Sequence, residues 1–491
     1  MNARLPSLAL LTTDARGHGI VLPGGARRPD GRSALVLGTG LAAALSLAAT
    51  ITLVGPRLTL FLILVLSLPV AIAVHPPVGA YILIAITPLV AGMDRGASVP
   101  LLRPNEAIMA LIALGLCGRA VFLMTAVRRP RLRLFRLDVA ILMVAVTSSI
   151  IPLAWLAARG QQIQSDDVLY SLMVWKYYAV FLIFRNAVRT PRQLRICLWL
   201  SMAAAGLVAV IAIFQSVQRF GVSAFLAKYY APYGNATAIS NNRGSSTLSL
   251  PIAVADLMVF NLAIAIGLLR ESKRRSVLIG LASLFVLGVF AAGEFSGVIG
   301  LVIGVVALAV ATRRARYLAV LPVSLITAAV ALRPVIDKRL QGFQSPSGLP
   351  ESWQGRLYDL ENYFFPQLFS HEHWLLGVRP SARVATPTRA AGYIWIESGY
   401  TWLLWAGGVP LLLSFFYFLW VSAKEAVRVL RARSDAGAAA ALAVITGVSV
   451  VGLLMILDPH LTYRGSADLL FALLGLTAAA SSMPLESPET R

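Results

Sequence analysis

Long apolar runs, separated by short polar or basic segments, make up most of the chain. The runs are roughly 17 to 25 residues long, which is the length an α-helix needs to cross the hydrocarbon core of a bilayer. The candidate spans are 34–54, 58–74, 77–93, 104–124, 137–157, 168–187, 194–216, 250–269, 276–292, 296–312, 316–332, 393–421, 436–457 and 465–482. The pattern predicts an all-α polytopic integral membrane protein with about 12 to 14 transmembrane helices.

Arginine and lysine gather in five short segments, 128–136, 189–195, 270–275, 313–316 and 424–433. With these spans all five fall on one side, which the positive-inside rule makes cytoplasmic. Both termini then lie inside, 1–33 as a disordered tail and 483–491 as a short one. Between them we expect a bundle over 34–332 with an outward loop at 218–249, a large extracytoplasmic loop at 333–392, and C-terminal spans over 393–482.

The loop 333–392 is the main polar insert between the spans, and a polar substrate of a membrane enzyme would bind in such a loop. Within it, apolar residues recur near helical spacing at Leu357, Leu360, Tyr363, Phe364 and Leu368. This pattern predicts one or two amphipathic helices on the outer membrane surface.

Composition supports the membrane assignment, with 58% hydrophobic and 13% charged residues and a mean hydropathy of +0.75. The formal net charge of +21 fits topology signals and contact with anionic lipids, and no soluble basic domain exists to bind nucleic acid. Phosphate-loop, dinucleotide-binding, zinc-protease and serine-hydrolase motifs are missing from the sequence. His371 and His373 form the one close histidine pair, but their spacing does not place both on one helix face, so we expect no metal site.

Ionisable residues within or beside the spans are costly and therefore functional candidates. Lys176 lies inside an apolar run, as a cation paired within the bundle or as a contact to an anionic substrate. Arg243 precedes Pro251, which can start a helix, so it is either an interfacial residue or part of a phosphate site. Glu294 and Glu397 lie at the outer edges of spans, where each either serves as a general base or forms a salt bridge with a loop arginine.

Four segments, in order, resemble the O-antigen ligase/polymerase superfamily, which comprises WaaL-type ligases and Wzy-type polymerases. The first is WKYYAVFLIFRN at 175–186, followed by TPRQL at 190–194. The second is RGSST at 243–247 with Pro251, and the third runs from Gly355-Arg356 through FSHEHWLLGV at 369–378. The fourth begins with ESGY at 397–400 and continues through AGG at 406–408. Together they cover roughly residues 140–430.

The resemblance implies a GT-C-like membrane glycosyltransferase that uses undecaprenyl-pyrophosphate-linked oligosaccharide at the outer face of the bacterial cytoplasmic membrane, without a metal or another cofactor. The implied catalytic residues are Arg243 and Arg356 on the pyrophosphate and Glu397 as base. The further candidates for substrate binding are Lys176, Tyr400, Arg379, Glu294 and His373. Membrane lipids and other polysaccharide assembly proteins are the expected partners, and nucleic acid is not.

Two departures from the family pattern bear on the activity. WaaL-type ligases carry a histidine where this chain has Glu397, which favours a polymerase of repeat units over a ligase that transfers glycan to lipid A-core or another acceptor. The family's outer Ser-Arg-Gly element reads EFSG at 294–297, so Arg356 is expected to substitute for the missing arginine. A transporter of lipid-linked sugar and a non-catalytic scaffold remain the alternatives of other classes.

Overall fold

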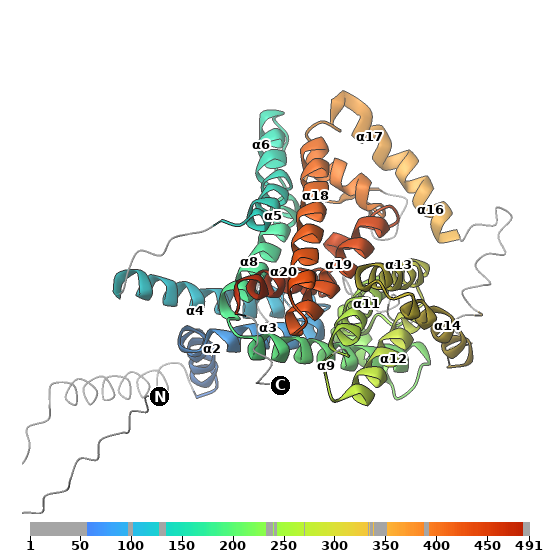
Figure 1. Ribbon diagram of the computed structural model, residues 1–491. Coiled ribbons are helices and arrows are strands. Elements are labelled where there is room, and N and C mark those ends of the chain that lie inside the picture. Colours follow the sequence, from blue (N-terminus) through green and yellow to red (C-terminus); the bar gives the residue numbers. More distant parts are fainter. Residues whose placement is uncertain are drawn as a thin grey trace, which may run out of the picture. The chain divides into compact units, whose positions relative to one another are not determined.

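The computed structural model describes residues 56–96, 102–126, 134–231, 239, 243–269, 271–331, 333, 337, 351–386 and 392–484 (Figure 1). The predicted tail 1–33, the predicted span 34–54 and most of the tail 483–491 lie outside this part. The chain divides into two units, Met1–Leu64 and Val65–Arg491. Of the first unit only the start of one helix is described, so the architecture below is that of the second.

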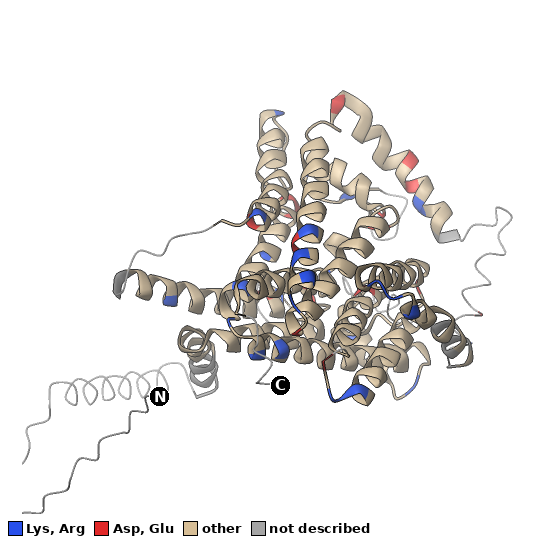
Figure 2. Cartoon of the chain, viewed as in Figure 1, with Lys and Arg blue, Asp and Glu red and all other residues tan. Residues whose placement is uncertain are grey.

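Nine helical spans in the described residues are long and apolar enough to cross a membrane, which confirms an all-α polytopic membrane protein at that level. The α-helices are α2 (Pro56–Val74), α3 (Pro76–Val90), α4 (Pro104–Ala126), α5 (Arg136–Thr147), α6 (Ile150–Ala158), α7 (Ser165–Ser171), α8 (Met173–Ala187), α9 (Pro191–Ser216), α10 (Val222–Tyr229), α11 (Pro251–Leu268), α12 (Arg275–Ala292), α13 (Phe295–Thr312), α14 (Val320–Ala331), α16 (Glu351–Asp359), α17 (Phe365–Phe369), α18 (Gly399–Ala432), α19 (Ala436–Leu454) and α20 (Ser466–Ser482). Shorter helical turns are η3 (Ser246–Leu248), η4 (Ala315–Ala319), η5 (Leu360–Phe364), η6 (Ser370–Glu372) and η7 (His460–Thr462), and two strands are β1 (Arg383–Ala385) and β2 (Tyr393–Trp395). Figure 2 shows long uncharged stretches along most of these helices.

Three predicted spans are interrupted, and the third, which is broken at Gly408 inside α18, also starts later than expected. Span 137–157 is divided into α5 and α6, where the hydroxyl of Ser149 bonds back to the carbonyl of Ala145 at 2.5 Å. Span 168–187 is divided in the same way into α7 and α8. The span predicted at 393 begins only at Gly399, because Tyr393–Trp395 pairs antiparallel with Arg383–Ala385 instead.

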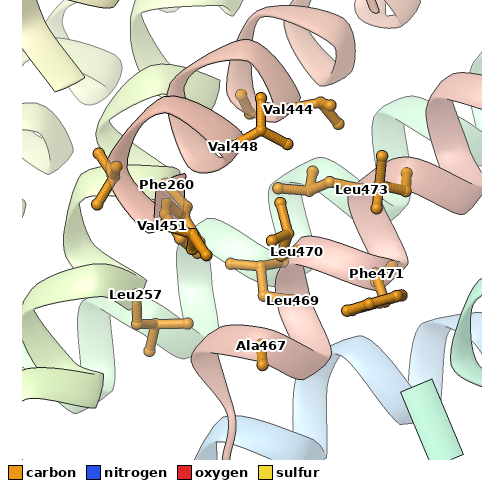
Figure 3. Packing of buried hydrophobic residues seen from close by; sticks show 14 of the residues in the cluster. Leu257, Phe260, Val444, Val448, Val451, Ala467, Leu469, Leu470, Phe471 and Leu473 are labelled. Carbon is orange, nitrogen blue, oxygen red and sulfur yellow. The ribbon is translucent and has the colours of Figure 1, made fainter. Parts of the chain in front are cut away.

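The packing core lies where α11, α19 and α20 meet (Figure 3). α11 is buried on all sides, and its Phe260 lies beside Val451 of α19 and Leu470 of α20. The ring of Phe471 stacks on Tyr177 of α8, with centroids 5.0 Å apart. A helix that is apolar all round belongs in the centre of such a bundle.

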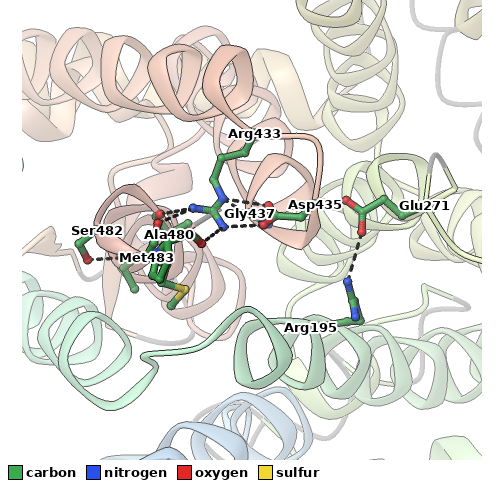
Figure 4. A network of polar contacts seen from close by, with 10 residues as sticks. Arg195, Glu271, Arg433, Asp435, Gly437, Ala480, Ser482 and Met483 are labelled. Atoms are coloured by element: carbon green, nitrogen blue, oxygen red, sulfur yellow. Dashed lines mark hydrogen bonds and ion pairs between the residues drawn. The ribbon is translucent and has the colours of Figure 1, made fainter. Parts of the chain in front are cut away.

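Helices α18, α19 and α20 run back and forth between two ends of the bundle. At one end Arg433 bonds to Asp435 and donates to the carbonyls of Ala480 and Met483, both at 2.9 Å (Figure 4). The other end holds the start of α18 and the loop between α19 and α20, which includes Asp458. We call these the Arg433 end and the Asp458 end.

The segment before α18 is fixed to the bundle at a break inside α18. Gly408 has φ +65°, and Val409 donates its N–H to the carbonyls of Trp374 and Leu375 at 3.1 and 3.2 Å. A Cβ at Gly408 would lie 2.3 Å from the Leu375 oxygen, so the close approach requires glycine. The carbonyl of Trp405, freed by the break, accepts from Val378 N at 2.7 Å.

The amphipathic helices predicted near 355–376 correspond to α16, η5 and α17. Phe364 of η5 is fully buried and packs edge-on against Trp405 of α18, with ring centroids 5.3 Å apart. Leu357, which the sequence predicted to share this apolar face, is exposed instead, and so is Phe369. This packing holds α16 beside the Asp458 end, whereas a GT-C-like arrangement of the whole bundle stays a prediction.

Candidate functional site: two charged clusters beside one loop

The loop between α19 and α20, residues 455–465, carries Asp458, His460, Tyr463 and Arg464. Tyr400 ties this loop to the start of α18, because its N–H donates to the carbonyl of Met455 at 3.0 Å. Polar side chains from α16, α11, α8 and α4 converge on the loop, and they form two clusters.

The first group, which we call the Arg356 cluster, consists of Arg356, Glu397, Asp458 and Tyr463. Arg356 Nε lies 2.7 Å from Glu397 Oε2, and Arg356 Nη1 lies 3.0 Å from Asp458 Oδ2. The Tyr463 hydroxyl donates to the other Asp458 oxygen at 3.4 Å. One guanidinium therefore serves two carboxylates, and the formal charge of the cluster is −1.

The two carboxylates differ in exposure: the Asp458 side chain is 3% accessible and that of Glu397 is 51%. Burial raises the pKa of Glu397, the Arg356 guanidinium acts against this, and the neighbouring Asp458 charge raises the pKa further. Because half of the side chain still meets solvent, water offsets part of the burial, and a substrate can reach the carboxylate. For Arg356, burial alone would lower the pKa, but the two carboxylates raise it, so this residue keeps its positive charge.

Asp256 and His460 form a buried pair that anchors the loop. His460 Nδ1 lies 2.8 Å from Asp256 Oδ2, and both side chains are at most 2% accessible. The ring of His460 also packs edge-on against Tyr463, with centroids 5.4 Å apart. Since Asp256 belongs to the buried helix α11, this pair fixes the loop, and with it Asp458, to the bundle core.

A second group of charged residues surrounds the hydroxyl of Tyr177. Lys176 Nζ lies 3.0 Å from Asp468 Oδ1 and 4.5 Å from the centre of the Tyr177 ring. Asp468, Glu106, Arg103 and Arg464 all lie within electrostatic reach of the Tyr177 hydroxyl.

Two further contacts complete this second group. Glu106 pairs with Arg95 at 3.1 Å and with Arg103 at 3.4 Å. Within the described part of the chain, Arg464 has no carboxylate within ion-pair distance. We call the whole set the Lys176 cluster: Arg95, Arg103, Glu106, Lys176, Arg464 and Asp468. Its four cations face two carboxylates, which leaves a formal charge of +2.

The structure brings together only two of the residues that the sequence nominated as catalytic. Glu397 and Arg356 form a direct ion pair. Arg243, assigned with Arg356 to the pyrophosphate, instead pairs with Glu294 at 3.1 Å. Lys176 is paired within the bundle, as one of its two interpretations anticipated.

The remaining nominated residues take part in contacts that hold the fold. Arg379 forms two hydrogen bonds to the buried Asp167, at 3.0 and 2.6 Å. The Tyr400 hydroxyl donates to the carbonyl of Gly452 at 2.6 Å, and His373 Nδ1 lies 2.9 Å from the carbonyl of Gln367. These contacts do not show whether Arg379, Tyr400 or His373 binds a substrate, so their roles in substrate binding stay predictions.

Sequence reasoning found Glu397 but missed three other acidic residues of the clusters, Asp458, Glu106 and Asp468, and the buried Asp256–His460 pair. A signal existed, because Asp256 and Asp468 are single carboxylates within apolar runs, and such residues are functional candidates by default. Asp458 and His460 lie in a short loop that looked like an ordinary connection. In the described residues, no three histidine, cysteine or acidic side chains come close enough to hold a metal ion.

Comparison with protein-family models and with curated proteins found no match for this chain.

Proposed function

We propose that the protein is a glycosyltransferase of the bacterial cytoplasmic membrane. It would use undecaprenyl-pyrophosphate-linked oligosaccharide at the outer face and polymerise the repeat units of a surface polysaccharide. The observation that carries the proposal is an accessible carboxylate, Glu397, paired with Arg356, which also binds Asp458 of the 455–465 loop; the same loop carries Arg464 of the Lys176 cluster, in which cations outnumber carboxylates. An inverting transfer from a diphosphate needs both parts, a base for the acceptor and cations for the leaving group.

In the proposed reaction, Glu397 accepts the proton of the acceptor hydroxyl as that oxygen attacks the anomeric carbon of the donor sugar. The bond between this carbon and the diphosphate oxygen breaks, and both of its electrons leave with the diphosphate. The configuration at the anomeric carbon inverts, and Glu397 then releases its proton to water. The products are one new glycosidic bond and undecaprenyl pyrophosphate.

The family resemblance assigns Arg356 to the pyrophosphate, but the contacts of this residue favour another role. Arg356 is engaged by Glu397 and by the buried Asp458, so its role in the proposal is to orient the base. The diphosphate is assigned to the Lys176 cluster, where Arg464 has spare charge for phosphate oxygens. Burial, and after it the second carboxylate, raises the pKa of Glu397, which strengthens it as a base.

The test uses purified protein in lipid with undecaprenyl-pyrophosphate oligosaccharide, and the products are resolved by size. A ladder of longer lipid-linked glycans supports the polymerase. Transfer of intact glycan to a different lipid or protein would make the enzyme a ligase. Movement of lipid-linked sugar between leaflets without any transfer would refute the proposal and favour a transporter.

Matched variants assign the chemistry to the site. Glu397→Gln keeps the size of the side chain but removes the base. Glu425→Gln is the control, because Glu425 lies towards the Arg433 end of α18 and its pair with Arg428 is local. The expected result is a loss of transfer in Glu397→Gln and normal transfer in Glu425→Gln, with both proteins inserted and equally stable.

A further inference from the structure

A row of aromatic side chains leads along the β-hairpin towards Glu397. From Tyr393 to Glu397 the backbone is extended, since β2 pairs with β1 and the pairing continues with a bond from Ile396 N to the carbonyl of Ala382 at 3.0 Å. In an extended chain alternate residues share a face. Ile394 and Ile396 are buried, so Tyr393, Trp395 and Glu397 share the opposite, more accessible face.

Neighbouring side chains widen this row. The ring of Tyr170 in α7 lies 6.1 Å from that of Trp395, and Tyr393 lies edge-on to Trp395 at 5.4 Å. Arg383, the cross-strand partner of Trp395, places its guanidinium 4.8 Å from the Tyr393 ring. We call Tyr170, Tyr393 and Trp395 the aromatic strip. All three side chains are partly buried.

We propose that the aromatic strip binds a saccharide chain and delivers its end to Glu397. The apolar C–H faces of sugar rings pack on aromatic faces, and their hydroxyls accept or donate hydrogen bonds at flanking charged groups. The strip offers both, since the Arg383 guanidinium, which also pairs with Asp166, lies against the Tyr393 ring and the face ends at the Glu397 carboxylate. A glycan is favoured over a lipid headgroup because the strip is continuous, residue by residue, with the ion pair of Glu397 and Arg356.

This inference rests on the proposed function and extends it, because it identifies the acceptor as a glycan long enough to reach from Glu397 to Tyr393.

The experiment measures binding of lipid-free oligosaccharides, released by mild acid from the surface polysaccharide of the cells that make the protein. Purified protein in nanodiscs is titrated by calorimetry. Trp395→Leu is expected to weaken binding about tenfold, the loss of one aromatic contact. Trp395→Phe keeps a ring and should retain most of the affinity. Trp420→Leu is the matched control, because Trp420 is an exposed tryptophan far along α18.

Each outcome decides one of the two proposals. Equal binding by Trp395→Leu and Trp420→Leu, or no binding by the wild type, would overturn the strip and leave Trp395 as a membrane-interface residue. If the wild type binds the oligosaccharide and Trp395→Leu does not, the strip stands. The binding result supports the strip even if the wild type transfers no sugar from undecaprenyl pyrophosphate. In that case only the transferase proposal is refuted.

Discussion

Removing the Arg356 side chain should destabilise the protein far more than removing any exposed arginine. Asp458 is 3% accessible, and Arg356 is its charged partner at 3.0 Å. In Arg356→Ala the Asp458 carboxylate stays buried with only the long 3.4 Å bond from Tyr463. Breaking a buried ion pair in this way costs about 3–5 kcal/mol, because the charge that remains has lost its partner.

A matched variant sets the scale for this effect. Arg243 also forms an ion pair, with Glu294 at 3.1 Å, but its side chain is 38% accessible. Exposed pairs contribute at most about 1 kcal/mol, so Arg243→Ala should lose much less stability than Arg356→Ala. The contrast between the two variants isolates burial, because the residue type and the substitution are the same.

The assay is reversible unfolding in mixed micelles by titration with sodium dodecyl sulfate, followed by tryptophan fluorescence. Asp458→Asn removes the stranded charge, so the double variant Arg356→Ala/Asp458→Asn should recover about 1–3 kcal/mol relative to the sum of the single variants. The reasoning is refuted if Arg356→Ala unfolds within about 0.5 kcal/mol of the wild type, the range of ordinary surface substitutions. It is also refuted if the double variant shows no coupling.

Four further predictions follow from the site and from the fold. Glu397→Gln should lower kcat by about 10²- to 10⁴-fold if this residue is the base, measured as glycan transfer. Glu397 can act as a base only when it is ionised, at a pH above its pKa. Since this pKa is raised, kcat/KM should already fall on acidification at a pH above the ordinary carboxylate range. Asp458→Asn removes a negative charge beside Glu397 and should move this fall in kcat/KM to lower pH. A pH–rate profile without such a shift would contradict the prediction. Arg464→Met should raise KM for the diphosphate donor roughly tenfold with little change in melting temperature, since one charge-assisted contact is lost; an unchanged KM would remove the Lys176 cluster from the donor site. Gly408→Ala should lower the free energy of unfolding by more than about 1–3 kcal/mol, because Gly408 has a positive φ and an added Cβ would clash with the Leu375 carbonyl. A normal melting temperature would contradict the described break in α18.

Local patterns predicted the helices well because bilayer length and apolar composition are properties of a single segment. The span predicted at 104–124 corresponds to α4, and those at 276–292 and 296–312 match α12 and α13 within one residue. The boundaries that failed depended on remote partners. Tyr393–Trp395 is as apolar as a helix start, and only its pairing with Arg383–Ala385 makes it a strand.

The candidate site was only half visible for the same reason. Glu397 and Arg356 stand out in sequence as charges in or beside the predicted loop 333–392. The second carboxylate that pairs with Arg356, Asp458, is 102 residues from Arg356 and 61 residues from Glu397, and no local pattern links the three. Arg243 looked equivalent to Arg356 until its neighbour, Glu294, was placed beside it.

By itself, the sequence determined that the chain is a polytopic helical membrane protein, because the hydrophobic effect acts on each apolar run wherever its neighbours lie. The family resemblance supplied a hypothesis about activity. Tertiary structure alone decided which charges meet: Arg356 with Asp458 and Glu397, and Lys176 with Asp468. Coulombic interactions fall off with distance and depend on burial, and the fold sets both.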